Sequence, residues 1–406
     1  MMKKLAIITV IISTFISCGD HSHLHDGIWR AELALVEKAA PFLIELKYAH
    51  TDTAMVVLMN GEERVELKNC VINGDSITIP IEAYDTRIEA VLNNHTLEGL
   101  FIKNYIENDP GVPFKAEYGN KQRFEPVSQP SLVKIDGKWE VLFISEEGDT
   151  ANNVGIFKSE GTTVTGSVLT SFGDLRFLEG NYTENGIQLS AFAGLSPYLL
   201  EITFDGNDAF EGILYTTRSK TKMIGKRNEQ AGLADPYSLT SMKPGMETLS
   251  FSLPNTEGQI ISINDERYRD KVLIVSVLGS WCPNCLDEMA FLSPWYSANR
   301  DRGVEVVGLA FERKDDFSYA QGTLQRLKQR YNTEYEILFG GQAGRESTGK
   351  ALPELEKINS YPTTFFIDKK GKVRKIHTGF NGPATGLFYE EFKRDFNSLV
   401  DQLVAE

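Results

Sequence analysis

The hydrophobic pattern of this chain changes once, near residue 244, and the change restricts what each part can fold into. Between about 27 and 227 the apolar residues form short alternating or β-branched runs that end at turn residues, as in 162–170 (TTVTGSVLT). This period of two is typical of antiparallel strands. Beyond residue 244, continuous apolar runs such as 271–280 (KVLIVSVLGS) alternate with helical patterns such as 323–331 (TLQRLKQRY). We therefore expect a multidomain protein, with an antiparallel all-β region followed by an α/β domain.

The β region contains two similar halves. DGIW at 26–29 resembles DGKW at 136–139, and IEAVLNNHTLEGLFI at 88–102 resembles LEITFDGNDAFEGILY at 200–215. The spacing between the matched segments changes only slightly, as insertions in loops would make it. We therefore expect two related β units, packed as sandwiches or as halves of one barrel.

The complete predicted organisation follows from these patterns, and three single residues in the β region need comment. The predicted segments are a signal peptide at 1–17, a tether at 18–26, β units at 27–130 and 131–228, a linker at 229–243 and an α/β domain at 244–406. Trp29 and Trp139 open the two units, and we expect them to anchor the cores, with sugar stacking as the alternative. Cys70 is expected to be a small buried hydrophobic residue.

In the α/β domain, further strands and helices are expected. Apolar runs predict strands at 303–312 (GVEVVGLAFE) and 361–368 (YPTTFFID), and KVRKIHTGF at 372–380 predicts an edge strand. Helices are expected over 351–358 (ALPELEKI) and over 389–404, where the pattern is amphipathic.

Charge and cysteine count exclude several classes of protein. The chain has 406 residues with 42 basic and 56 acidic side chains, which gives a formal charge of −14. An acidic chain without a basic cluster is poorly suited to bind nucleic acid or anionic lipid surfaces. Only four cysteines are present, too few for a disulfide-stapled scaffold.

The N-terminus predicts export and a lipid anchor. Lys3 and Lys4 precede an apolar run that is too short to span a bilayer, which needs ~20 apolar residues, and that fits a signal peptide. Ser17 followed by Cys18 resembles a bacterial lipobox, in which Cys18 would be lipidated; a simply cleaved signal or an uncleaved anchor is the alternative. The residue after Cys18 is Gly rather than Asp, which favours the outer over the inner membrane.

Three alternating histidines, His21, His23 and His25, follow the lipobox. Alternating histidines can bind copper or zinc loosely, but a polar tether is the expected role and no metal site is predicted.

Cys282 and Cys285, in GSWCPNCLDEM, point to redox chemistry. A structural zinc site needs four ligands, and only His377 lies downstream of this pair as a further His or Cys. A structural disulfide across two residues would close a tiny loop and remove little chain entropy. The pair follows a buried strand and precedes a helical pattern, and a helix N-terminus stabilises a thiolate.

These motifs resemble the thioredoxin fold and, within it, the TlpA/ResA-type envelope thiol-disulfide oxidoreductases. FSLPNTEGQIISI resembles the lead-in hairpin of that family, WCPNC its active site, SYPTTFFIDKKGKV its cis-proline strand, and HTGFNGPATG its closing loop. The resemblance covers about two-fifths of the chain, whereas the β region resembles no family that we can name.

The resemblance implies a role for individual residues. Cys282 would be the nucleophile, Cys285 the resolving thiol and Pro362 the cis proline. Glu288 would exchange a proton with Cys285, and a surface carboxylate at a helix start is its alternative. The residues expected to contact a substrate are Trp281, Pro283, Asn284, Tyr361 and Thr363.

The implied activity is disulfide exchange with protein substrates, and we expect it to be their reduction, with electrons supplied by a membrane electron donor. It would need no cofactor besides the Cys282–Cys285 disulfide. A thiol peroxidase of the peroxiredoxin type is an alternative, although SVLGSW before Cys282 lacks the Pro and Thr of that active site. A β-region binding protein with an accessory redox domain is another. Substrate, direction of electron flow and oligomeric state are not determined by the sequence.

Overall fold

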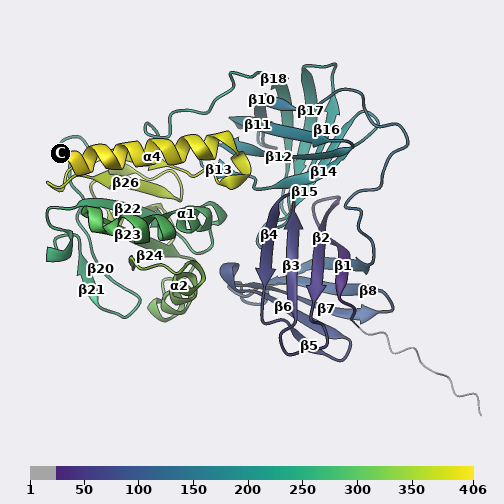
Figure 1. Ribbon diagram of the computed structural model, residues 1–406, viewed down its shortest axis with the longest axis horizontal. Coiled ribbons are helices and arrows are strands. Elements are labelled where there is room, and N and C mark those ends of the chain that lie inside the picture. The colour runs from purple at the N-terminus through teal and green to yellow at the C-terminus, as the bar shows by residue number, and fades with distance from the viewer. Residues whose placement is uncertain (1–23) are drawn as a thin grey trace, which may run out of the picture.

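The structure, a computed structural model, describes residues 24–406. The predicted signal peptide, the lipidation residue Cys18 and the histidines His21 and His23 lie outside the described residues. Two β-sheets lie one above the other, and the α/β domain lies beside both of them (Figure 1).

The first β unit is an open antiparallel sheet with the strand order β4-β3-β2-β1-β9-β8-β7-β6-β5. Its first strand pairs with its last, since β1 lies between β2 and β9. The elements are β1 (Gly27–Ala34), β2 (Ala39–Lys47), β3 (Met55–Asn60), β4 (Glu63–Leu67), β5 (Val71–Asn73), β6 (Ser76–Ile81), the short 3-10 helix η1 (Glu82–Tyr84), β7 (Thr86–Asn93), β8 (Thr96–Lys103) and β9 (Val112–Tyr118).

The second β unit repeats this order but closes on itself. Its order is β11-β10-β18-β17-β16-β15-β14-β12-β13, and β11 also pairs with β12, which closes the sheet into a barrel. The elements are β10 (Gly137–Ile144), β11 (Thr150–Glu160), β12 (Thr163–Thr170), β13 (Gly173–Asp174), β14 (Leu178–Tyr182), β15 (Gly186–Ala191), β16 (Tyr198–Phe204), β17 (Ala209–Tyr215) and β18 (Lys220–Arg227). The two units are thus an open sheet and a closed barrel, not two halves of one barrel.

The two units share details that a duplicated unit would produce. Trp29 and Trp139 have no exposed surface, so both are core anchors as predicted and neither can stack on a sugar. Each indole N–H donates to the carbonyl four residues earlier, at 3.2 Å from Trp29 to His25 and 2.7 Å from Trp139 to Ile135. Glycines at matching places allow close strand contact, because an added Cβ would lie 1.9 Å from the Glu89 oxygen at Gly99 and 2.7 Å from the Glu201 oxygen at Gly212.

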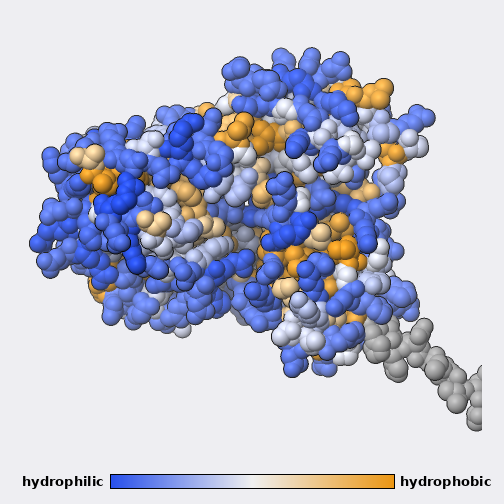
Figure 2. Space-filling model, in the orientation of Figure 1, coloured by the Kyte–Doolittle hydropathy of each residue, from blue (hydrophilic) through white to orange (hydrophobic). Residues whose placement is uncertain are grey.

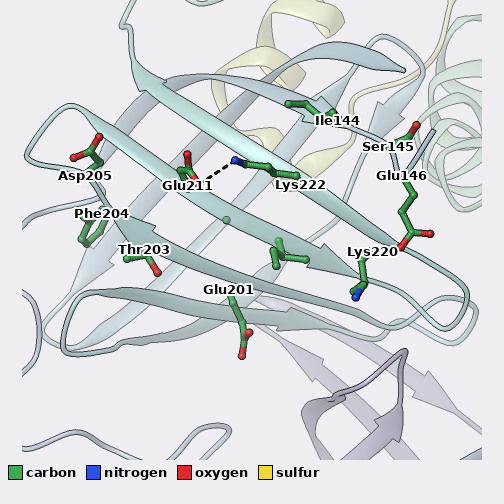
Figure 3. A pocket seen from close by; sticks show the side chains of 12 residues that line it. Ile144, Ser145, Glu146, Glu201, Thr203, Phe204, Asp205, Glu211, Lys220 and Lys222 are labelled. Atoms are coloured by element: carbon green, nitrogen blue, oxygen red, sulfur yellow. Dashed lines mark ion pairs between the residues drawn. The ribbon is translucent and has the colours of Figure 1, made fainter. Parts of the chain in front are cut away.

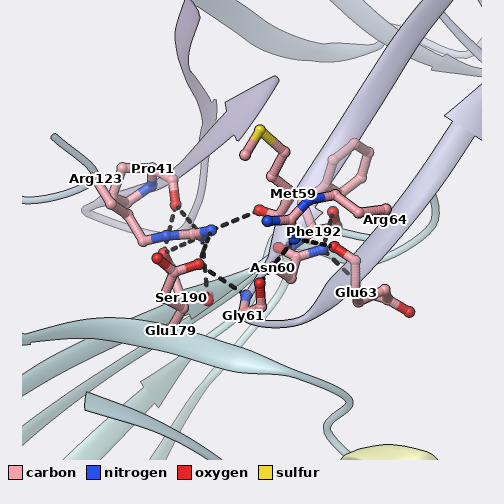
Figure 4. A network of polar contacts seen from close by, with 10 residues as sticks. All are labelled: Pro41, Met59, Asn60, Gly61, Glu63, Arg64, Arg123, Glu179, Ser190 and Phe192. Carbon is pink, nitrogen blue, oxygen red and sulfur yellow. Dashed lines mark hydrogen bonds and ion pairs between the residues drawn. The ribbon is translucent and has the colours of Figure 1, made fainter. Parts of the chain in front are cut away.

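A buried arginine fastens the two β units together (Figure 4). The Arg123 guanidinium donates to the Met59 carbonyl at 2.6 Å in the first unit and to Glu179 at 3.0 Å in the second. Beside it, the Asn60 amide exchanges two hydrogen bonds with the backbone of Phe192, at 3.0 and 3.1 Å. Because buried polar groups are costly unless paired, this network favours one arrangement of the units.

The C-terminal domain is built on a five-stranded sheet with the order β24-β23-β22-β26-β27, and helices pack against it. The strands β22, β23 and β24 are parallel to one another, whereas β26 runs antiparallel to both of its neighbours, β22 and β27. Strand β27 lies at the edge, as predicted. The elements are β19 (Ser241–Met242), β20 (Ser252–Pro254), β21 (Ile260–Ser262), η2 (Glu266–Tyr268), β22 (Val272–Leu278), α1 (Pro283–Asn299), η3 (Arg300–Arg302), β23 (Val304–Glu312), α2 (Phe317–Tyr331), β24 (Glu336–Gln342), α3 (Arg345–Ala351), β25 (Leu355–Lys357), β26 (Thr363–Ile367), β27 (Val373–Thr378), η4 (Pro383–Thr385) and α4 (Leu387–Ala405).

One sequence expectation for this part was wrong, and the end of the predicted linker is paired with the C-terminal domain. A helix was expected over 351–358, but α3 ends at Ala351 and Leu355–Lys357 forms β25, because Pro353 cannot continue a helix. The predicted linker 229–243 is also not free, since β19 pairs with β25. The hydroxyl of Thr240 lies 2.8 Å from that of Thr378, so the end of this segment belongs to the C-terminal domain.

The surface is rich in hydrophilic side chains (Figure 2). The face in Figure 2 is mainly hydrophilic, and its hydrophobic groups form separate small areas. Within residues 24–406, no helix has the length and apolar character needed to cross a membrane.

Candidate active site

The two cysteines lie where a buried strand ends and a helix begins. Strand β22 is buried along its whole length, and α1 starts at Pro283, directly after Cys282. Proline suits the first helical position because its missing N–H would have no partner there. Cys282 caps the helix: its Sγ accepts the backbone N–H of Cys285 at 3.2 Å. The two cysteines form a disulfide, with 5.2 Å between their Cα atoms.

A proline loop lies beside the disulfide, directly before β26, which is the neighbour of β22 in the sheet. The Tyr361–Pro362 peptide bond is cis, the geometry that the resemblance implies. The Tyr361 carbonyl oxygen lies 3.5 Å from the Cys282 sulfur, so the loop directly adjoins the first cysteine. Cys282 is 6% exposed and Cys285 is fully buried, so Cys282 is the more accessible of the two residues.

Two aromatic residues frame Cys282. Trp281 and Tyr361 meet edge to face, with 5.4 Å between ring centroids. The Trp281 indole N–H donates to the Phe311 carbonyl at 2.9 Å, which fixes the ring over the end of β23. Both are partly exposed, as a surface for substrate contact requires. Thr363 is different: its side chain is fully buried and its hydroxyl donates to the Ser360 carbonyl at 2.8 Å. A contact of Thr363 with a substrate would therefore come from its backbone, and it stays a prediction.

Glu288 is buried inside the domain, on the face of α1 that covers the sheet. Its carboxylate accepts hydrogen bonds from the hydroxyls of Ser276 on β22 and Thr364 on β26, both at 2.6 Å. Burial raises the pKa of Glu288 to about 7, and the two hydroxyl donors oppose that rise. Glu288 follows Cys285 by three residues, so both lie on one helix face, one turn apart. The carboxyl is thus able to gain or lose a proton near neutral pH, and it is not a surface group.

Glu312 is a site residue that the sequence analysis missed. It ends β23, is fully buried, and accepts the backbone N–H of Ser280 at 3.0 Å and its hydroxyl at 2.5 Å. Burial raises its pKa. These bonds hold the turn that leads to Trp281 and Cys282. The only sequence signal was a single acid at the end of an apolar run.

Both β units also reach this site, which no local motif could indicate. Arg313 lies 3.6 Å from the ring centroid of Tyr105 in the first unit and 5.6 Å from that of Trp281. Such cation–π contacts connect the first unit to the aromatic residue beside Cys282.

A cluster of ionisable groups beside the cysteines joins the two β units and the C-terminal domain. Arg176 of the second unit pairs with Asp287 on α1 at 2.8 Å and with Glu63 of the first unit. Burial raises the pKa of Asp287 to about 7, although Arg176 opposes that rise. Asp174 is also buried, its pKa is raised for the same reason, and its carboxylate accepts the Gly382 N–H at 2.7 Å. One arginine therefore serves several buried carboxyl groups.

Other features offer no competing site of this kind. In the described residues, no group of three or more His, Cys, Asp and Glu side chains is placed to hold a metal. A hollow of about 900 Å³ lies on the second β unit, and all its lining residues belong to that unit (Figure 3). Glu211 and Lys222, which pair there at 3.1 Å, give it mixed charge.

Comparison with known proteins points to the same domain. The model of the AhpC/TSA family matches residues 244–376. Thiol-disulfide oxidoreductase ResA of Halalkalibacterium halodurans is 25% identical over 150 residues, which are 37% of this chain and 75% of that protein. ResA of Geobacillus thermodenitrificans is 27% identical over 140 residues, or 34% of this chain and 72% of that protein.

A solved structure of a thioredoxin-family thiol:disulfide interchange protein from Chlorobium tepidum is 20% identical, covers 39% of this chain and 96% of its own, and has a TM-score of 0.30. The family model and the ResA relatives, together with the paired cysteines and the adjoining proline loop, carry the assignment. The C-terminal domain is therefore similar to the AhpC/TSA family and to the ResA thiol-disulfide oxidoreductases, which supports a thioredoxin-fold domain of the TlpA/ResA type with oxidoreductase activity.

Proposed function

We propose that the protein exchanges disulfides with protein substrates through Cys282 and Cys285, as a reductase in the cell envelope. The observation that carries this proposal is the Cys282–Cys285 disulfide at the N-terminus of α1, beside the cis-proline loop. Cys282 is the more accessible of the two cysteines and its sulfur caps the helix, so the helix dipole and the Cys285 N–H would both stabilise its thiolate.

The proposed reaction has two steps. The Cys282 thiolate attacks one sulfur of a substrate disulfide, which forms a mixed disulfide and releases the other substrate sulfur as a thiolate. The Cys285 thiolate then attacks the Cys282 sulfur, the Cys282–Cys285 disulfide forms, and the second substrate thiolate leaves. Two electrons pass from the protein to the substrate, and a membrane electron donor of the dithiol class would restore the reduced pair.

Glu288 would serve the second step. Its buried carboxyl lies one helical turn from Cys285, and its pKa of about 7 suits proton exchange at neutral pH. Deprotonation of Cys285 is needed before it can attack, and Glu288 is the nearest acidic side chain on its face of α1.

The test is disulfide reduction by the reduced full chain, with insulin as protein substrate and bis(2-hydroxyethyl) disulfide as small substrate. We expect both to be reduced, and Cys285→Ala to accumulate a mixed disulfide at Cys282 that mass spectrometry identifies. Cys70→Ser is the matched control, because Cys70 is a buried free cysteine of the first β unit. Reduction of neither substrate, together with turnover of a hydroperoxide, would favour the peroxidase instead.

The direction of electron flow needs a separate measurement. The potential of the Cys282–Cys285 pair, titrated against dithiothreitol and glutathione, should fall near that of the reducing thioredoxins, about −270 mV. A potential near that of strong oxidants, about −120 mV, would make the protein an oxidase.

The envelope location and the lipid anchor are part of the same proposal. Cys18 would carry the lipid, and the outer membrane is the expected site. Metabolic labelling with a fatty-acid analogue should mark the wild-type protein but not Cys18→Ala, and membrane fractionation should place the label in the outer membrane.

A further inference from the structure

A short segment of the second β unit lies on the candidate active site. Residues 171–176 (SFGDLR), which contain β13, connect β12 to β14, and β13 lies near the start of α4 (Figure 1). Gly173 forms a parallel β-bridge with Phe380 in the closing loop of the C-terminal domain. Asp174 accepts the Gly382 N–H at 2.7 Å in the same loop. The segment thus occupies backbone positions along this loop that an incoming chain could otherwise use.

The same segment presses on the dipeptide between the two cysteines. A Cβ added to Gly173 would lie 1.7 Å from the side-chain nitrogen of Asn284, so a larger residue here would require the segment or the Asn284 side chain to move. Its φ of +153° also disfavours other residues. The Asn284 side chain is consequently covered by a domain other than its own.

An ion pair fixes the far end of the segment. Arg176 reaches Asp287, two residues after Cys285, at 2.8 Å, and it also contacts Glu63 of the first unit. Both ends of residues 171–176 are therefore attached, one to the closing loop and one to α1.

Little room is left between the segment and the cysteine dipeptide. A cavity of about 90 Å³ lies there, and its lining includes Tyr84, Arg176, Tyr198, Pro283 and Asn284. This is space for a few water-sized groups or one small side chain. The segment therefore narrows the approach to the Pro283-Asn284 side of the disulfide.

We propose that residues 171–176 are a specificity-determining wall of the active site, which admits disulfides in small molecules or extended chains and excludes those on bulky folded surfaces. This inference rests on the proposed function, because it concerns which disulfides reach Cys282. Substrates would be selected by the space between this segment and the C-terminal domain, so the β region takes part in the choice of substrate.

The test compares the access of small and bulky reagents to Cys282 in the reduced full chain. Iodoacetamide is the small probe and a polyethylene-glycol maleimide the bulky one, with the modified cysteine located by mass spectrometry. In Gly173→Ala the added methyl group clashes with Asn284 and disfavours the φ of +153° that the segment adopts, so we expect the segment to be displaced. Gly161→Ala is the matched control, because Gly161 is a positive-φ glycine of the same barrel with no atom near its absent Cβ.

We expect Gly173→Ala to raise the ratio of bulky to small reaction rates by about tenfold, the change expected when a local opening equilibrium loses one anchoring contact. Gly161→Ala should keep the wild-type ratio. The ratio of insulin to bis(2-hydroxyethyl) disulfide reduction should rise in the same variant. An unchanged ratio in Gly173→Ala overturns the inference, and failure of the wild type to reduce either disulfide would count against the proposed function instead.

A second variant decides the matter if Gly173→Ala does not fold. Asp174→Ala removes the acceptor of the Gly382 N–H without adding bulk, so the segment keeps the Gly173–Phe380 bridge but loses its side-chain contact with the closing loop. The bulky-to-small ratio should rise in this variant too. A folded Asp174→Ala protein with the wild-type ratio would show that residues 171–176 do not limit access.

Discussion

Helix α1 has two sides, and different regions of the molecule supply their polar partners. On the side that faces the sheet, Glu288 contacts Ser276 and Thr364, which are neutral groups of its own domain. On the side that faces the β region, Asp287 contacts Arg176, which lies 111 residues away in the sequence. Burial raises the pKa of both acids to about 7.

The difference separates chemistry from assembly. The hydrogen-bond partners of Glu288 all belong to the C-terminal domain, so a substitution of Glu288 should change the rate of the redox reaction. The ion pairs around Asp287 form only when both β units and the C-terminal domain are packed together, so a substitution there should change how stably these three parts are held together.

The largest expected effect is on the chemistry. Cys282→Ser removes the nucleophile, and we expect disulfide reduction to fall by more than about a thousandfold. The midpoint of denaturant unfolding under reducing conditions should change little, because the two side chains differ by one atom. Activity assays with insulin and unfolding curves on the same preparation check both statements. Residual activity above one-tenth would mean that another group attacks the substrate.

Next comes the assembly side of the comparison. Arg176→Met leaves Glu63 and Asp287 without their counter-ion, and breaking a buried ion pair in this way costs about 3–5 kcal/mol. Lys222→Met is the matched control, because it breaks an exposed pair worth at most about 1 kcal/mol. Denaturant unfolding measures both. A cost equal to that of the control would mean that the cluster does not hold the junction together.

Glu288 makes a pH-dependent contribution to stability. Its pKa is raised from 4.5 to about 7 in the folded state, so the folded state holds the proton more tightly. The wild type should therefore lose stability relative to Glu288→Gln as pH rises from about 4.5 to 7, by about 3 kcal/mol in total. Unfolding free energies of both proteins at pH 4 and pH 8 give this difference. Parallel pH curves would contradict it.

The smallest expected effect concerns the rate of resolution. Glu288→Gln should slow release of the mixed disulfide at neutral pH by about tenfold, which is less than the ~100-fold or more that a general base usually contributes. The rate of attack by Cys282 should change less. Glu312→Gln, which also removes a buried carboxylate near the site, should leave the pH profile of resolution unchanged. An unaltered profile in Glu288→Gln would assign that residue a purely structural role.

The sequence predicted the features that depend on neighbours in the chain. The paired cysteines, Glu288 and Pro362 lie within short motifs whose strands and helices are encoded locally. The role of Arg176 could not be predicted, because its partners Glu63 and Asp287 lie more than a hundred residues before and after it in the sequence. The failed helix at 351–358 is a different case, because Pro353 was a local signal against it, whereas the pairing of β25 with β19 could not be seen in the local sequence.

The placement of the tryptophans makes the molecule suited to fluorescence. Trp29 and Trp139 are rigidly enclosed, one in each β unit, while Trp281 borders the disulfide and Trp295 bonds to Asn397 at 2.8 Å within the C-terminal domain. A variant that keeps a single indole, with Phe at the other three positions, would report on one part of the chain alone. Emission from Trp281 should be quenched by the adjacent disulfide and recover on reduction, whereas Trp29 and Trp139 should emit at short wavelength in both states. Three optical signals would then distinguish the order in which the parts lose their structure.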